Sequence, residues 1–145
     1  MVRNEQVTCP YCQARFASIA ALERHAPHCP RGQSKEAERV IEALQWKKGR
    51  IAQTINECYR TAARTFHSYH TGALTYARLF HGHVETEVET IRSDLAALLQ
   101  AVEQAHKTHF PYLSKTKREV EELIPQSKDL ESILSTLDGE YGRTN

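Results

Sequence analysis

The sequence predicts a mostly α-helical fold: a small metal-stapled module, then a long coiled-coil-like helix, then short C-terminal helices. Three of the four cysteines and three of the five prolines lie in the first 30 residues. From Lys35 to Lys107 there is no proline, and apolar residues recur there every three or four positions, which is typical of an amphipathic helix. We therefore expect three regions, at residues 7–31, 34–109 and 114–138.

The composition is that of a soluble chain. Of its 145 residues, 40% are hydrophobic and 26% are charged, and no apolar run is long enough to cross a bilayer. Residues Met1–Gln6 indicate neither a secretion signal nor a transit peptide. We expect a cytoplasmic protein that does not bind membranes. A cytoskeletal or ciliary assembly is a more specific hypothesis, and the nucleus is the alternative compartment.

The small net charge of +1 hides an uneven distribution. Residues 1–50 carry nine Lys/Arg and five Asp/Glu, whereas residues 84–105 carry one Arg and five acids. Two differently solvated faces are the favoured interpretation. The alternative is that the basic N-terminal third binds an acidic surface or a polyanion.

Four residues near the N-terminus have the spacing of zinc ligands. Cys9, Cys12, His25 and Cys29 follow the pattern C-x2-C-x12-H-x3-C, which lets two thiolates, an imidazole and a third thiolate close a tetrahedron around one Zn²⁺. His28 competes for the fourth position, but only two residues separate it from His25 and three to five are usual. Cys29 is therefore preferred.

The ligand spacing and its apolar neighbours resemble the ββα zinc fingers, specifically the variants with Cys-Cys-His-Cys ligands. The resemblance covers residues 7–31 and implies a tiny core of Phe16 and Leu22 beneath the metal. Single fingers of this kind beside coiled coils occur in scaffold and adaptor proteins, including some that bind ubiquitin. Beyond residue 31 the chain resembles no family that we recognise.

The zinc site is expected to be structural. All four coordination positions have protein ligands, which leaves none for water or substrate, and metal binding to such a small unit supplies folding energy on the order of 10 kcal/mol. The chain contains no G-x-S-x-G, P-loop or Rossmann glycine pattern, so no catalytic residues are assigned and no enzyme is expected. His67 and His70 could share a second metal, but interfacial hydrogen bonding is favoured.

Nucleic acid is the less favoured partner of the finger. In DNA-binding relatives three helix positions face the bases, and here they are Ser18, Ala21 and Arg24. Only Arg24 can make a bidentate base contact, and no second finger follows. Trp46 beside Lys47–Arg50 is an aromatic–basic cluster, for which a packed Trp next to a solvated turn is the favoured interpretation.

Ubiquitin is a further candidate for the finger. Ile19, Ala20 and Glu23 would offer a small patch on the finger helix. In one ubiquitin-binding family an acid lies between the last two ligands. Here Ala26-Pro27-His28 contains none, which counts against that family.

The long helix is predicted from a heptad seam. Its residues are Val84, Val88, Ile91, Leu95, Leu98, Val102 and Ala105. Upstream, the stripe continues through Tyr59, Ala63, Phe66, His70, Ala73, Ala77 and Phe80, with one stutter at Phe80–Val84–Val88. A single helix, capped by Ser34 and bent near Gly82, is favoured over a hairpin that turns at Thr71-Gly72.

The C-terminal segment is expected to form short helices. Pro111 ends the long helix, and Thr116-x-x-Glu119 has capping-box spacing. Pro125 interrupts the helix that begins there, and Leu130–Leu137 forms a final amphipathic segment that ends at Gly139.

The combined expectation is a non-enzymatic structural or adaptor subunit of a larger assembly. A single amphipathic helix would expose its seam to water, so we expect self-association or a protein partner through residues 59–105. A nucleic-acid-associated protein, bound through the basic N-terminal third, is the alternative.

Overall fold

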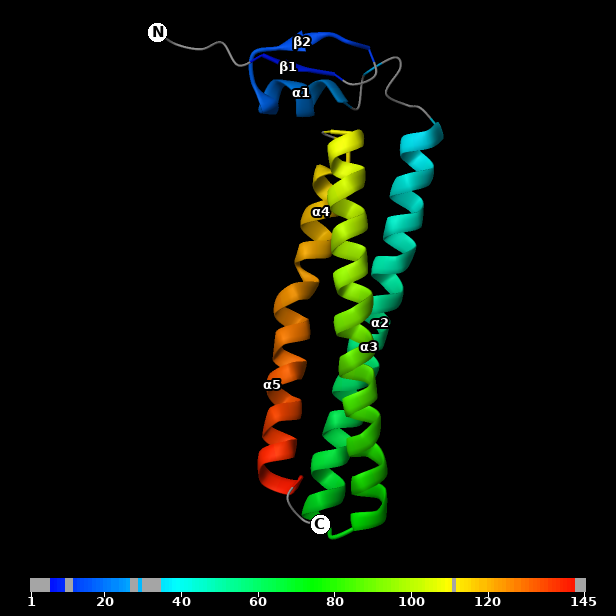
Figure 1. Ribbon diagram of the computed structural model, residues 1–145, viewed down its shortest axis with the longest axis vertical. Helices are drawn as coiled ribbons and strands as arrows, with labels where there is room; N and C mark the ends of the chain where they lie inside the picture. The colour runs from blue at the N-terminus through cyan, green and yellow to red at the C-terminus, as the bar shows by residue number, and fades with distance from the viewer. Residues whose placement is uncertain (1–5, 10–11, 27–28, 30–34, 111, 143–145) are drawn as a thin grey trace, which may run out of the picture. The chain divides into compact units, whose positions relative to one another are not determined.

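The computed structural model describes residues 6–9, 12–26, 29, 35–110 and 112–142 (Figure 1). A short β-hairpin and a short helix come first, and long helices follow, so the mostly α-helical prediction is confirmed. The elements are β1 (Val7–Thr8), β2 (Arg15–Phe16), α1 (Ile19–His25), α2 (Lys35–His70), α3 (Leu74–Thr108), α4 (Ser114–Glu121) and α5 (Leu123–Tyr141). Ser34 and Pro111, the predicted boundaries of the long helix, lie outside the described residues.

The chain forms two compact units. The first comprises Met1–Lys47 and Leu98–Glu121, and the second comprises Lys48–Ala97 and Glu122–Asn145. Because α2 and α3 contribute to both, neither unit is a continuous stretch of sequence. Among the described residues, no helix combines the length and the apolarity that a membrane span requires.

The prediction of one helix over residues 34–109 is wrong, because the chain turns at Thr71–Ala73 and forms a hairpin. Gly72 adopts the left-handed conformation, with φ of +79°. The amide of Gly72 donates to the carbonyl of Tyr69 (3.3 Å), and that of Ala73 donates to Ser68 (2.9 Å). These two bonds form a Schellman cap, which satisfies carbonyl groups at the end of α2 and stops the helix.

The heptad seam on α3 is confirmed as a buried stripe, but one of its positions is occupied by a different residue from the one predicted. His81 is buried whereas Phe80 is only half-buried. With His81 in place of Phe80, the spacing is an unbroken alternation of four and three, and the predicted stutter disappears. The buried residues of this stripe are Ala77, His81, Val84, Val88, Ile91, Leu95, Leu98 and Val102.

On α2 the buried stripe lies one position before the predicted one. The structure buries Ile51, Ile55, Cys58, Ala62 and Thr65, and leaves Tyr59 and Phe66 half-buried and Ala63 exposed. Burial raises the pKa of the Cys58 thiol to about 12, so this thiol stays protonated and packs as a small apolar group. Cys58, Ala62 and Thr65 have the same spacing of four and three as Tyr59, Ala63 and Phe66, so the spacing alone could not distinguish the two stripes.

Helix α5 covers the seam within the second unit. It begins at Leu123, and Pro125 lies in its first turn, where a missing backbone N–H costs nothing. The Tyr59 hydroxyl donates to the carbonyl of Gln126 (3.4 Å), and Arg92 Nε pairs with Glu131 Oε1 (2.6 Å). The seam residues of this unit are therefore buried by other parts of the same chain.

In the first unit, α4 packs beside the start of α2 and the end of α3. The Gln45 amide donates to Thr116 Oγ1 (3.3 Å) and Glu119 Oε1 (3.2 Å). Lys117 pairs with Glu103 (3.2 Å) and lowers the pKa of that carboxyl. These contacts hold α4 against α2 and α3 within the first unit.

The turn at Gly72 predicts opposite effects for two glycine substitutions. Gly72→Ala should lower the free energy of unfolding by about 1–2 kcal/mol, because alanine resists the left-handed conformation. Gly49→Ala is the matched control, since Gly49 lies inside α2 with nothing within 4 Å of an added Cβ. It should raise the free energy of unfolding by about 0.5–1 kcal/mol.

Denaturant unfolding followed by circular dichroism measures both changes. If Gly72→Ala stabilised the protein as Gly49→Ala does, the residue would belong to a continuous helix and the hairpin would be refuted.

Candidate metal centre

A tight turn after β1 positions the first two cysteines. Strands β1 and β2 are antiparallel, and Val7 pairs with Phe16. The Cys9 amide donates to the carbonyl of Ala14 (2.9 Å), and the Gln13 amide donates to that of Cys9 (3.0 Å). Gln13 takes φ of 65° to close this turn. The turn therefore directs the Cys12 side chain back toward Cys9.

Helix α1 supplies the histidine. Ser18 caps its N-terminus, since the Ser18 hydroxyl accepts a hydrogen bond from the amide of Ala21 at 3.1 Å. Leu22 is fully buried, and the His25 ring lies 4.6 Å from that of Phe16, centroid to centroid. The predicted core of Phe16 and Leu22 is thus present, and it holds the His25 imidazole in place.

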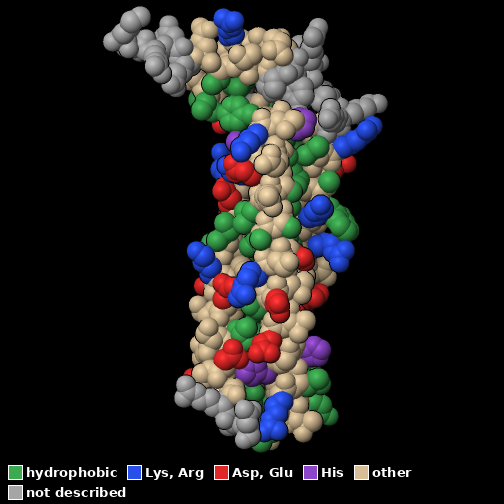
Figure 2. Space-filling view, viewed as in Figure 1, with side chains coloured by type: hydrophobic (Ala, Val, Ile, Leu, Met, Phe, Trp, Pro, Cys, Tyr) green, Lys and Arg blue, Asp and Glu red, His purple; other side chains and the backbone are tan. Residues whose placement is uncertain are grey.

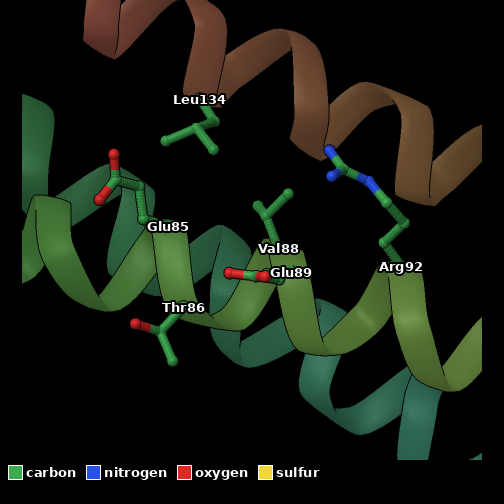
Figure 3. A pocket seen from close by; sticks show the side chains of 6 residues that line it. All are labelled: Glu85, Thr86, Val88, Glu89, Arg92 and Leu134. Atoms are coloured by element: carbon green, nitrogen blue, oxygen red, sulfur yellow. The ribbon is translucent and has the colours of Figure 1, made fainter.

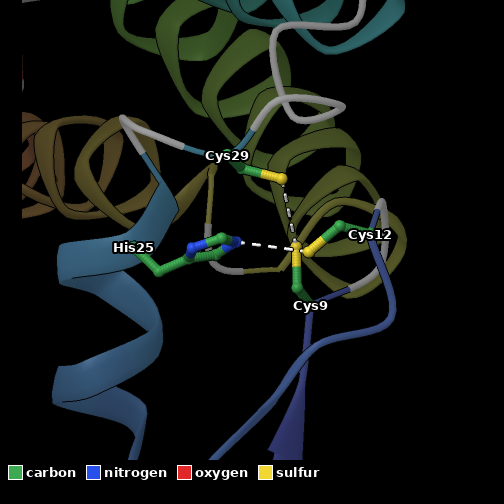
Figure 4. A group of neighbouring side chains, drawn as sticks. All are labelled: Cys9, Cys12, His25 and Cys29. Carbon is green, nitrogen blue, oxygen red and sulfur yellow. Dashed lines mark hydrogen bonds between the residues drawn. The ribbon is translucent and has the colours of Figure 1, made fainter.

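The four predicted ligands converge (Figure 4). Their donor atoms all lie within 4.8 Å of one another. Cys9 and Cys29 Sγ are 3.7 Å apart, and Cys12 Sγ is 3.3 Å from His25 Nε2. A tetrahedral ion with bonds of about 2.3 Å to sulfur and 2.0 Å to nitrogen would give separations of about 3.8 and 3.5 Å. The cluster can therefore hold one metal ion.

The spacing of the sulfurs excludes a disulfide. A disulfide needs its sulfurs about 2.05 Å apart, whereas Cys9 and Cys29 keep 3.7 Å between theirs, and all four cysteines of the chain are free thiols. His28, the competing fourth ligand, lies outside the described residues, so the structure places Cys29 and does not place His28.

The neighbouring thiols change the pKa values of Cys12 and His25. For Cys12, the Ala14 backbone N–H lowers the thiol pKa, but burial and the thiols of Cys9 and Cys29 raise it by more. For His25, burial lowers the imidazole pKa, and the two buried thiols more than reverse that effect. Three thiolates this close repel one another, so a cation is needed to hold them all deprotonated.

Two aromatic residues of the site were missed by the sequence analysis. Phe110 and Tyr112 pack against the buried cluster of Cys9, Leu22 and Cys29. The Tyr112 hydroxyl lies 3.5 Å from Cys9 Sγ. Burial, together with the cysteine sulfurs, raises the pKa of Tyr112. The phenol therefore stays protonated and can donate to a Cys9 thiolate.

The only sequence signal for this contact was an aromatic pair flanking Pro111 just after the long helix. Nothing local links that pair to a cysteine more than one hundred positions earlier, since Cys9 and Tyr112 are 103 residues apart. The finger is therefore packed against the helical part of its own unit, and is not an independent module.

Loss of the metal should consequently extend beyond the finger. Cys12→Ser should remove the ion and the amide-exchange protection of the finger, and should also loosen Phe110 and Tyr112, which pack on the cluster. Helical circular dichroism should barely change, because the second unit makes no use of these ligands. Elemental analysis and hydrogen exchange measure these effects, and cooperative unfolding of the whole chain would contradict them.

The identity of the fourth ligand can be tested by a matched pair of substitutions. Cys29→Ala should abolish tight metal binding, because it removes a sulfur that lies 3.7 Å from Cys9 Sγ. His28→Ala should leave it nearly intact. Competition with a chromophoric chelator measures both affinities, and the reverse order would show that His28 is the ligand.

Comparisons with known proteins do not assign the site. No protein-family model, no curated protein and no solved structure matches this chain. What remains is the geometry itself: two strands of two residues, a seven-residue helix and a compact cluster of three cysteines and one histidine.

Proposed function

We propose that this protein is a non-enzymatic adaptor, in which a zinc finger of the Cys-Cys-His-Cys class stabilises one end of a helical interaction module. The observation that supports this most directly is the Cys9, Cys12, His25, Cys29 cluster. Thiolates with imidazole favour zinc. Four protein donors fill a tetrahedral shell and leave no position for substrate, which suits a structural ion.

The finger's own core supports a folding role for that ion. Among the described residues of the finger, the fully buried ones are Cys9, Leu22 and Cys29, and two of these three are ligands. So small an apolar core cannot offset the loss of chain entropy, and metal binding would supply the difference. Three metal-binding thiolates also need a reducing environment, which supports a cytoplasmic or nuclear location.

An exposed apolar patch supports protein binding. Tyr76 and Leu79, three positions apart in the first turns of α3, are 62% and 55% exposed. The Tyr76 ring also stacks on Phe80, at 6.3 Å between centroids. Clusters of large apolar side chains on a protein surface often mark interaction sites. We place the partner surface here because the seam at Val84–Val102 is already buried.

A second exposed apolar residue lies on the finger. Ile19 is exposed at the start of α1, and Ala20 and Glu23 are exposed beside it in sequence. This patch keeps ubiquitin, or another protein with a small apolar surface, as a candidate partner of the finger.

The adaptor proposal predicts that one substitution removes a bound protein. Leu79→Asp places a charge in the patch, and Ser93→Asp adds the same charge at an exposed position further along α3. Affinity purification with quantitative mass spectrometry should find at least one protein that Leu79→Asp reduces about tenfold and Ser93→Asp retains. Elemental analysis should find zinc in all three proteins. Equal recovery of every protein with both variants would contradict the proposal.

The runner-up is nucleic-acid binding, and one observation favours it. Trp46 is 63% exposed, so the expectation of a packed indole is wrong, and Lys47 follows it in sequence. An exposed aromatic beside a cation can stack on an unpaired base. On the face shown in Figure 2, however, positive and negative side chains are interspersed, whereas nucleic-acid surfaces gather positive charge.

Trp46 is the only tryptophan and serves as a fluorescent reporter of this alternative. Single-stranded oligonucleotides that quenched its emission, with an affinity that fell steeply as salt rose, would favour nucleic acid over the adaptor.

A further inference from the structure

The second unit contains another group of metal-ligating side chains, distinct from the finger. His81 and Glu85 lie one turn apart on α3, and Asp138 lies near the end of α5. Each offers one donor atom, and the three atoms lie within 4.8 Å of one another. The sequence had offered His67 and His70 as ligands of a second metal, but both are exposed on α2. No described Cys, Asp, Glu or further His completes a ligand group with them.

The His81 ring is held from both sides. The residue is 8% exposed. Its Nδ1 lies 2.8 Å from the Tyr69 hydroxyl, and its Nε2 lies 2.7 Å from Asp138 Oδ1. Tyr69 is itself stacked on Tyr141, with 4.0 Å between centroids and 4° between planes. A hydrogen bond to the ring nitrogen that does not bind the metal, as between Tyr69 and Nδ1 here, orients a ligating imidazole and raises its affinity for a metal.

We propose that His81 Nε2 and the carboxylates of Glu85 and Asp138 bind a divalent transition-metal ion of the zinc type. One imidazole and two carboxylates suit Zn²⁺ and its neighbours. In the bound state the neutral His81 ring takes the tautomer whose hydrogen is on Nδ1 instead of Nε2, which leaves the Nε2 lone pair for the ion. The Nδ1–H then donates to the Tyr69 oxygen. Water completes the coordination shell.

A groove lies beside Glu85 (Figure 3). The groove has a volume of about 360 Å³. It is lined by Glu85, Thr86, Val88, Glu89, Arg92 and Leu134. Glu85 belongs to both the groove and the ligand group, so the cluster adjoins a surface hollow at this carboxylate.

Calorimetric titration of the full chain tests the site. The protein, with its finger already loaded by one equivalent of Zn²⁺, is titrated with further Zn²⁺ and should bind a second equivalent. Glu85→Gln and Asp138→Asn should each abolish that second event, because each removes a charged carboxylate from the ligand group. Tyr69→Phe should weaken it roughly 10–100-fold, as loss of an outer-shell partner does.

Glu89→Gln is the matched control, since Glu89 lines the same groove one turn from Glu85 but is outside the ligand group. It should bind the second ion as the unmodified protein does. Co²⁺ gives an independent readout, because an ion on nitrogen and oxygen lacks the thiolate charge-transfer absorption of an ion in the finger.

Either of two results would overturn the proposal. The first is an unmodified protein that binds no second equivalent, which would leave His81 and Asp138 as a hydrogen-bonded clasp alone. The second is a second equivalent that survives both Glu85→Gln and Asp138→Asn.

Discussion

The reversal of the chain at Gly72 is the constraint on which the helical part of the second unit depends. Helices α2 and α3 each carry a stripe of buried side chains, and an apolar stripe is stable only when another apolar surface covers it. The turn brings the two stripes together, and α5 supplies a third helix. Tyr69 reaches His81 only because they lie on opposite sides of this turn, 12 positions apart.

In the first unit the corresponding constraint is the metal cluster. The finger has too few apolar residues to fold on hydrophobic burial alone, and two of its three most buried described residues, Cys9 and Cys29, are themselves ligands. Phe110 and Tyr112 extend that core toward the helices. The two units therefore depend on different interactions, ligation in one and helix packing in the other.

The features that could be predicted from the sequence are those that depend on local patterns. The ligand set could be predicted because the spacing of Cys9, Cys12, His25 and Cys29 is a property of one short segment. The helical class could be predicted because the absence of proline and the heptad spacing are equally local. The single helix was wrongly favoured over the hairpin because antiparallel helices bury the same heptad stripe as one long coiled coil, so the spacing does not distinguish them. A glycine within the pattern was the one clue, and only its left-handed conformation shows that it ends a helix.

The discontinuity of the two units has a consequence for synthesis on the ribosome. In the first unit Cys9 contacts Tyr112 and Gln45 contacts Glu119, at sequence separations of 103 and 74. In the second, His81 contacts Asp138 across 57 positions. Neither unit can complete its packing until most of the chain has emerged from the ribosome. Until then, the finger lacks its contacts with the segment around α4, and the helical hairpin lacks α5. Contacts this distant make folding slow, and the growing chain exposes apolar helix faces during that delay.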